Sequence, residues 1–459
     1  RAINTGKVVT RGEDAFGMYA WHNSFVGNFG DGVVRTWGER SHGMVASDNS
    51  RAVNTGRVAT RNEGSYGMYA LDNSFAGNFG GGVVRTWSDG SHGMVAEDQS
   101  RAVNTGKVVT TGNNAHGMLA LKGSEVRNEG TIETTGENAR GMVARNQSKA
   151  FNLGNVITKG GNAHGMVARN QSKALNWGSV VTSSGDAYGM YAVNNSFAGN
   201  FGDGTIETDG DGSHGMVAED QSRAVNTGKV VTHGDNAFGM YALNDSFAGN
   251  FSSDTVETWG AGSHGMVAED YSTAVNTGKV VTHGDDAYGM YALNESFVGN
   301  FSGGVVRTWG EGSHGMAAEF NSRAVNTGRV VTRGGNAFGM YAAHNAKAFN
   351  DGEVETAGDG SHGMRASGSG EVHNLGSGTV ATEGEKAHGM YADAFSKAFN
   401  DAAIVATGLD SDAVRLEENS SLVNTGVLDS AQGNALTALT SSDATLLDGT
   451  VLAGSHTLM

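Results

Sequence analysis

Proline and cysteine are both absent from the 459 residues of this chain. Proline lacks a backbone N–H, so its absence suits a chain in which nearly every backbone donor is used in a β-ladder. The absence of cysteine excludes a disulfide framework, a thiolate metal site and a cysteine nucleophile. A chain with 72 glycines and no proline is therefore unlike a generic flexible linker.

Charge is also scarce. Only 17% of the residues are charged, and 48 acidic residues outnumber 31 basic ones, which gives a net charge of −17. This balance argues against a nucleic-acid partner, because nucleic-acid binders carry a basic surface. No apolar run approaches the roughly 18 residues that a membrane-spanning helix needs. The chain begins at Arg1 without a signal peptide, so we expect a mature or excised fragment.

A Gly-Met dipeptide recurs sixteen times, from Met18 to Met390, at intervals of 24 or 26 residues. Counted from this Met as position 0, position +2 is always Ala, +10 is always Asn, −8 is always Thr and −10 is Val or Ile. Fixed small or apolar residues alternate with variable ones, which is the period of a β-strand. Each repeat holds three such segments, separated by Gly, Asn, Asp and Ser, which favour turns.

This pattern predicts an all-β fold, a parallel β-helix (β-solenoid) with three strands per coil, 24–26 residues per coil and about 19 coils. In the 26-residue coils the two extra residues follow the fixed Asn and enlarge a turn. We expect a regular array over residues 1–408 and degenerate terminal coils or a transition segment over residues 409–459.

Stacked coils place identical residues about 4.8 Å apart. The Asn at +10 is therefore expected to form a side-chain amide ladder, and the Thr at −8 is expected to stack in the same way. The Gly at −1 is expected to meet a crowded backbone. The predicted ladder residues include Asn54, Asn104, Asn152, Asn226, Thr60, Thr110, Thr158 and Thr232.

Histidine occupies position −2 in nine repeats and is replaced by Phe, Tyr or Arg in the others. This exchange favours a flat, outward stacking row over a metal site, and we expect neither metal nor cofactor. The recurring Ser-His-Gly is interpreted as structural, because a catalytic triad is a single constellation. The turn at residues 209–212 could hold Ca²⁺ weakly but is interpreted as solvated. We therefore expect no enzymatic activity.

Aromatic residues recur at two outward positions, +7 and +1. At +7, Phe alternates with Arg in adjacent coils, which is a cation–π arrangement. This surface either stiffens the stack or binds sugars or another copy, because exposed apolar patches mark interaction sites. The candidate ligand-binding residues are Phe25, Phe75, Phe197, Phe247, Phe297, Tyr19, Tyr69, Tyr191, Tyr241 and Tyr291.

The segments at residues 103–110 and 129–136 resemble the N-x-G-x-I-x-T-x-G coils of autotransporter (type V secretion) passenger domains and haemagglutinin-like repeat adhesins of Gram-negative bacteria. Residues 444–451 are similar to the end of such passengers. The resemblance covers nearly the whole chain. It implies a right-handed β-helix, export to the cell surface, and a C-terminal β-barrel translocator in the full-length protein.

We therefore expect a rigid, surface-exposed passenger that mediates adhesion or cell–cell aggregation through repeated weak contacts. Its partners would be glycans or proteins of host or neighbouring cells, or further copies of itself. Two alternatives remain open: a self-assembling filament or surface-layer protein, and a polysaccharide-acting enzyme of the tailspike or lyase type.

Overall fold

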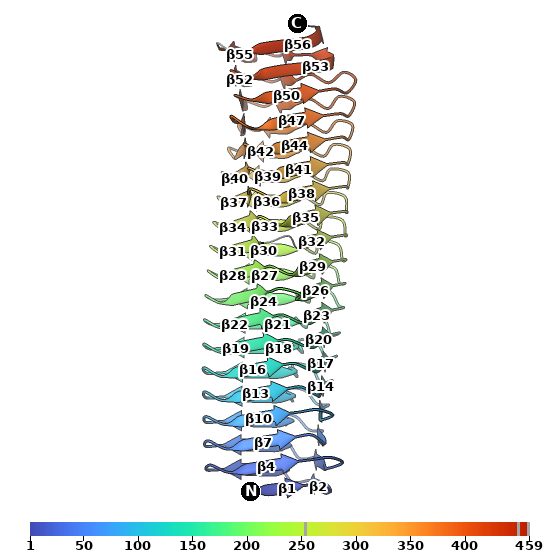
Figure 1. The fold of residues 1–459 in the computed structure, drawn as a ribbon, viewed down its shortest axis with the longest axis vertical. Coiled ribbons are helices and arrows are strands. Elements are labelled where there is room, and N and C mark those ends of the chain that lie inside the picture. Colours follow the sequence, from blue (N-terminus) through green and yellow to red (C-terminus); the bar gives the residue numbers. More distant parts are fainter. Residues whose placement is uncertain (252–254, 448–449, 457–459) are drawn as a thin grey trace. The chain divides into compact units, whose positions relative to one another are not determined.

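The computed structural model describes residues 1–251, 255–447 and 450–456. Within these residues the chain forms 56 β-strands and no helix, so it contains no helix that could cross a membrane. The chain divides into two compact units, Arg1–Val231 and Thr232–Met459. Each unit is a right-handed parallel β-solenoid with three strands per coil, which confirms the predicted fold class (Figure 1). The strands account for 18 complete coils and two further strands.

Within a unit, strands with the same place in the coil stack in parallel on one of three faces, named A, B and C here (Figure 1). Up to residue 400, the strands of face A end at the fixed Asn, those of face B end at the fixed Thr, and those of face C begin at the fixed Met. In the first unit, face A consists of β1 (Ala2–Asn4), β4 (Phe25–Asn28), β7 (Arg51–Asn54), β10 (Phe75–Asn78), β13 (Arg101–Asn104), β16 (Glu125–Asn128), β19 (Lys149–Asn152), β22 (Lys173–Asn176), β25 (Phe197–Asn200) and β28 (Arg223–Asn226).

Face B of the first unit consists of β2 (Lys7–Thr10), β5 (Val33–Thr36), β8 (Arg57–Thr60), β11 (Val83–Thr86), β14 (Lys107–Thr110), β17 (Thr131–Thr134), β20 (Asn155–Thr158), β23 (Ser179–Thr182), β26 (Thr205–Thr208) and β29 (Lys229–Thr232). Face C of this unit consists of β3 (Met18–Trp21), β6 (Met44–Ser47), β9 (Met68–Leu71), β12 (Met94–Glu97), β15 (Met118–Leu121), β18 (Met142–Arg145), β21 (Met166–Arg169), β24 (Met190–Val193) and β27 (Met216–Glu219).

The second unit repeats the same plan. Its face A consists of β31 (Phe247–Asn250), β34 (Thr273–Asn276), β37 (Phe297–Asn300), β40 (Arg323–Asn326), β43 (Lys347–Asn350), β46 (Glu371–Asn374), β49 (Lys397–Asn400), β52 (Ser421–Asn424) and β55 (Asp443–Leu446). Its face B consists of β32 (Thr255–Thr258), β35 (Lys279–Thr282), β38 (Val305–Thr308), β41 (Arg329–Thr332), β44 (Glu353–Thr356), β47 (Thr379–Thr382), β50 (Ala403–Ala406), β53 (Val427–Asn434) and β56 (Val451–His456). Its face C consists of β30 (Met240–Leu243), β33 (Met266–Glu269), β36 (Met290–Leu293), β39 (Met316–Glu319), β42 (Met340–Ala343), β45 (Met364–Ser367), β48 (Met390–Ala392), β51 (Val414–Leu416) and β54 (Leu436–Ala438).

The two extra residues of a long coil lie in the turn between faces A and B, as predicted. In the first long coil this turn contains Gly30, whose φ of 59° suits a residue without a Cβ. The strands on both sides keep their register, because Asn28 still pairs with Asn54 and Val34 with Val58. A register shift interrupts the pattern at residues 430–434, within the segment where terminal coils are expected to degenerate.

The core of each unit is a narrow column of small or slim side chains. Met94, Ala96, Ala102 and Val108 of one coil are fully buried. Each pairs with its equivalents in the neighbouring coils, so Met contacts Met and Ala contacts Ala. A coil of 24–26 residues encloses too little space for large side chains, which explains why these positions are fixed.

The fixed Asn residues form a buried ladder at the turn between faces A and B. The side-chain amide of Asn104 donates to the Oδ1 of Asn128 at 2.8 Å and to the carbonyl oxygen of Gly106 at 3.2 Å. Asn54, Asn152 and Asn226 take part in the same kind of contact with a neighbouring coil. Both amide hydrogens therefore have acceptors, which a buried polar group requires.

The fixed Thr residues are buried at the end of each face-B strand. The Oγ1 of Thr60, Thr110 and Thr232 donates to the carbonyl oxygen five residues later, at 2.6–2.9 Å, and so closes the next turn of its own coil. The Oγ1 of Thr158 is buried without a partner among the described atoms.

We expect Asn152→Ala to lower stability by about 2–4 kcal/mol, because Asn128 and Asn176 both lose a buried hydrogen-bond partner. Asn155→Ala, three residues later at an exposed position, serves as the control and is expected to change stability by less than about 0.5 kcal/mol. Urea unfolding followed by circular dichroism measures both. Equal midpoints for the two variants would contradict a stabilising ladder.

The glycine at −1 sits where two coils approach closely, as predicted. A Cβ added at Gly117 would lie 2.2 Å from Cγ2 of Ile132 and 2.6 Å from the carbonyl oxygen of Gly141. No side chain fits there without moving the backbone of the next coil.

Gly117→Ala is accordingly expected to destabilise the fold by about 3 kcal/mol or more through overpacking. Gly161→Ala is the matched control, since a Cβ there meets no atom within 4 Å. The same urea midpoints test this pair, and a Gly117 variant as stable as the Gly161 variant would refute the crowding argument.

Candidate functional site

The predicted aromatic residues lie on two different faces. The five Phe residues at +7 begin strands β4, β10, β25, β31 and β37 of face A. The five Tyr residues at +1 are second in strands β3, β9, β24, β30 and β36 of face C. The predicted residues therefore form two separate aromatic rows, one on face A and one on face C.

On face A each Phe lies half-buried beside a second Phe from the enlarged turn. The rings of Phe75 and Phe79 are nearly parallel, with centroids 6.2 Å apart. Both cover Gly77, where a Cβ would lie 2.2 Å from Phe79 and 2.8 Å from Phe75. Glycine at +9 thus provides the space in which the two rings lie flat on the sheet. The same arrangement recurs at Gly27, Gly199, Gly249 and Gly299.

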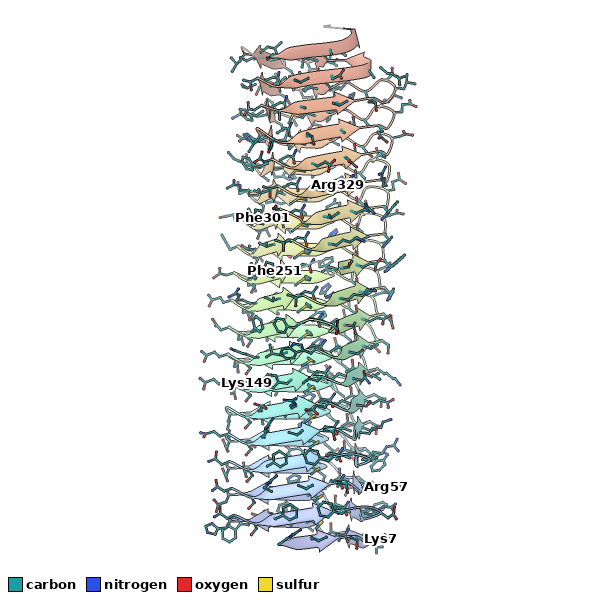
Figure 2. All side chains as sticks on the ribbon, in the orientation of Figure 1. Lys7, Arg57, Lys149, Phe251, Phe301 and Arg329 are labelled. Carbon is teal, nitrogen blue, oxygen red and sulfur yellow. The ribbon has the colours of Figure 1, made fainter. Side chains whose placement is uncertain are left out.

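Basic residues separate these ring pairs along face A. Arg51 pairs in register with both Phe25 and Phe75, and its guanidinium lies 5.2 Å from the Phe75 ring centroid. Arg323 lies 4.4 Å from the Phe349 ring in the second unit. Figure 2 shows Phe251, Phe301 and Lys149 on the outer surface. Aromatic rings and cations therefore alternate over β4, β7, β10 and β13, and they lie side by side again at β25 and β28 and at β37 and β40.

On face C the Tyr residues at +1 are anchored to glutamates of the next coil. The hydroxyl of Tyr69 donates to the Glu97 carboxylate at 2.6 Å, and that of Tyr291 donates to Glu319 at 3.3 Å. Tyr191 and Tyr241 make the same contact with Glu219 and Glu269. Burial and this carboxylate raise the pKa of Tyr69. In the first coil, Tyr19 is 49% exposed.

The row at −2 stacks as predicted, but the expectation that it faces outward is wrong. The rings of His92 and His116 stack with centroids 4.8 Å apart, and His116 is only 5% exposed. The Tyr at +1 covers the row, since the Tyr69 ring contacts His42 and Tyr66 edge-on. The alternation pattern indicated that this Tyr points outward, but it did not indicate that its ring would cover the row at −2.

Each buried imidazole accepts a hydrogen bond from the backbone of the next coil. The N–H of His116 donates to Nδ1 of His92 at 3.0 Å, and the N–H of Tyr188 donates to Nδ1 of His164. An accepting Nδ1 requires a neutral ring with its proton on Nε2. Burial lowers the pKa from 6.5 to about 4 for His92 and to about 3 for His164 and His314.

These lowered pKa values predict that acid destabilises the fold. The unfolded chain binds protons below about pH 6.5 while the folded rings stay neutral to about pH 4, so stability falls as the pH drops through this window. Other coils carry Phe at this position, for example Phe16 and Phe338. We expect His92→Phe to reduce the dependence of the unfolding free energy on pH by up to about 1.4 kcal/mol per pH unit. Urea midpoints between pH 7 and pH 4 measure the slope; an unchanged slope in the variant contradicts the assignment.

Face B carries an arrangement that the repeat pattern did not predict. In the first unit the guanidinium of Arg61 lies between two indoles, 4.6 Å from the Trp37 ring and 5.0 Å from the Trp87 ring. A groove of about 380 Å³ runs along these residues and includes Arg35, Arg57 and Arg85. Each of these residues is unremarkable within its own repeat, and the arrangement arises only when three coils are compared at the same outward positions.

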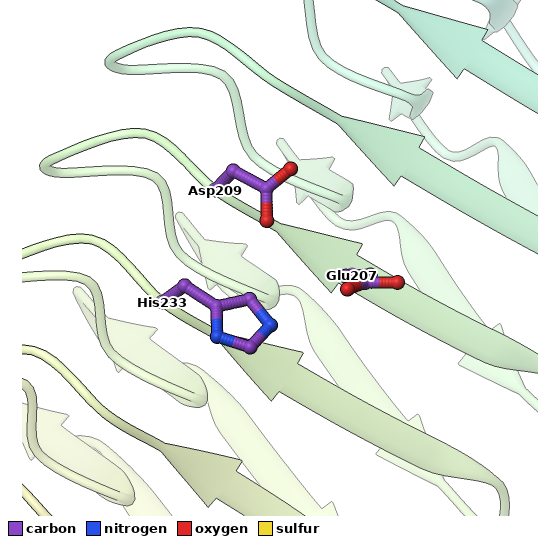
Figure 3. Close-up of side chains that lie close together, drawn as sticks. All are labelled: Glu207, Asp209 and His233. Atoms are coloured by element: carbon purple, nitrogen blue, oxygen red, sulfur yellow. The ribbon is translucent and has the colours of Figure 1, made fainter.

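In the acidic turn at residues 209–212, the side chains of Asp209 and Asp211 are exposed. In the first unit Glu207 lies in β26 and Asp209 follows that strand, and both are exposed (Figure 3). In the second unit His233 follows β29 and is also exposed (Figure 3). We base no binding assignment on these side chains.

Comparison with known proteins relates this chain to one family. A family model described as the BigA third pectate lyase-like domain matches residues 1–97, 81–301 and 239–403. The cryo-EM structure of the Vag8–C1 inhibitor complex is similar at 15% identity with a TM-score of 0.43, over 97% of this chain and 99% of that chain. None of the curated proteins matches. The overlapping family matches extend from residue 1 to residue 403, across nearly all of the regular repeats.

Proposed function

Because the chain belongs to the family of BigA third pectate lyase-like domains and is an autotransporter-type passenger, we propose that it mediates adhesion at the surface of a Gram-negative bacterium. Passengers of this type are secreted to the cell surface, and we propose the same location for this chain. The description pectate lyase-like names a type of domain, and the proposed function does not include a lyase reaction.

The alternation of aromatic rings and cations on face A carries this proposal. Arg and aromatic residues are enriched at the energetic centres of protein interfaces. Face A supplies them in both units, with Phe25, Phe75 and Phe197 in the first and Phe247 and Phe297 in the second. Glycine beneath the rings keeps them flat on the sheet, which suits contact with an extended partner.

Repetition makes weak contacts sufficient. A single half-exposed ring and its neighbouring guanidinium offer a small contact area, so each is expected to bind weakly. A partner that meets several coils at once gains avidity without any new kind of contact. Glycans or proteins of a host or neighbouring cell are the proposed partners, and a second copy of the chain is an alternative that the same experiment separates.

We expect the triple variant Phe75→Ala, Phe197→Ala, Phe297→Ala to reduce adhesion by about tenfold or more when the chain is displayed on a non-adherent Gram-negative host. The matched control is Trp259→Ala, Tyr271→Ala, Trp309→Ala, which removes three exposed aromatic rings outside face A and is expected to retain adhesion. Cell-binding counts and sedimentation of the displaying cells measure both variants.

Adhesion that is equal in the two triple variants would contradict the assignment to face A. Light scattering by the purified chain separates the two kinds of partner. An apparent molar mass from scattering that rises with concentration in the native chain and not in the Phe variant would place the contact between copies of the chain. Release of unsaturated oligosaccharides from a panel of polysaccharides would instead support the lyase alternative.

A further inference from the structure

Face B of the first coils carries cations without carboxylates, although the whole chain has a net charge of −17. Within the part of the chain that the structure describes, these side chains are exposed and make no ion pair. We call them the cationic checkerboard, and they are Lys7, Arg11, Arg35, Arg57, Arg61 and Arg85. The checkerboard ends at Lys107, which is paired with Glu133 at 3.1 Å.

The register of the strands keeps these cations apart. Arg57 lies between Val33 and Val83 in adjacent coils, and Ala59 lies between Arg35 and Arg85. Like charges are therefore never directly opposite, where they would destabilise the sheet. Cations in one column recur every second coil, about 9.6 Å apart by strand spacing. A regular row of positive sites results, separated by small apolar side chains.

The two indoles give the central cation a defined orientation. Trp37 and Trp87 lie on either side of Arg61, and the guanidinium carbon lies over both indole rings. The N–H donors of a guanidinium lie along its edges. A guanidinium held in this way is suited to bidentate contact with a sulfate or carboxylate.

One arginine at a corresponding position of the second unit is neutralised. Arg329 occupies the same place in β41 as Arg57 does in β8, and it forms ion pairs with Glu355 at 2.7 Å and with Glu353 at 3.1 Å. Figure 2 labels Arg57 and Arg329 on their strands. The repeat can therefore accommodate carboxylates on face B, and the face-B strands of the first four coils carry cations and no carboxylate.

We propose that the cationic checkerboard binds an anionic glycan, with a single chain laid along successive coils and its sulfate or carboxylate groups meeting the guanidinium edges. Glu39 and Glu63 lie in the turns just beyond the strands, so the positive surface is only about one strand, roughly 13 Å, wide. This width suits one extended chain and disfavours a membrane surface. Arg61 covers the inner faces of both indoles, which nucleic-acid bases would need for stacking.

This binding site is independent of the phenylalanines on face A. It would add a charge-based contact to a passenger whose proposed adhesion uses aromatic rings. Its partner class is defined by regularly spaced anions on a sugar chain, and the contact weakens as salt rises, because bound counterions are released on association.

The test uses the full chain and a fluorescent heparin oligosaccharide, titrated at several salt concentrations. We expect Arg35→Gln, Arg57→Gln, Arg85→Gln to bind at least about tenfold more weakly and with a shallower salt dependence than the native chain. The matched control Lys159→Gln, Arg329→Gln, Lys347→Gln removes the same charge from cations that are ion-paired with glutamates outside the checkerboard, and it is expected to bind as the native chain does. Replacement of the first three arginines by lysine is expected to retain most of the salt dependence.

Several outcomes would overturn the proposal. They are no binding of heparin or hyaluronan by the native chain, equal losses in the two Gln variants, or binding of single-stranded DNA or phosphatidylserine vesicles as tight as that of heparin. Unchanged urea midpoints establish that the variants are folded. The face-A Phe variant is expected to keep its heparin affinity, so failure of this proposal and failure of the adhesion proposal can be told apart.

Discussion

In-register stacking is the interaction on which the rest of this structure depends. Each residue of a coil pairs with the residue at the same position in the neighbouring coil, at the spacing of β-strands. Every inward side chain must therefore fit against a near copy of itself. Asn satisfies this condition because an amide both donates and accepts, and Met, Ala and Val satisfy it because they are slim and apolar.

The same condition explains two features that look unrelated. The imidazoles at −2 stay neutral because each Nδ1 accepts the next backbone N–H and the ring is buried, and a stack of charged rings would repel itself. Glycine at −1 is required because the carbonyl oxygen of the next coil occupies the place of a Cβ. Proline is excluded for a related reason, since stacked coils use nearly every backbone N–H.

Outward positions obey a weaker condition and therefore vary. Arg alternates there with Phe on face A and with Val or Ala on face B of the first coils, whereas Lys149 lies directly opposite Lys173. Because the outer surface contributes little to folding, its composition can differ between coils. Arg57 and Arg329 show the range, since one makes no ion pair in the described structure and the other is held by two glutamates.

The sequence by itself determined the strands, the length of a coil and the side chains that stack, because period-two alternation and a fixed repeat specify both direction and register. The buried column of Met94, Ala102 and Val108 follows directly from that pattern. Only the tertiary structure decided which outward rows are covered and which remain accessible. Tyr69 folds over His42, and Arg61 enters between Trp37 and Trp87, because turns and neighbouring coils set these side-chain directions. Such contacts join residues 24 or more positions apart, where a single repeat carries no information about its neighbours.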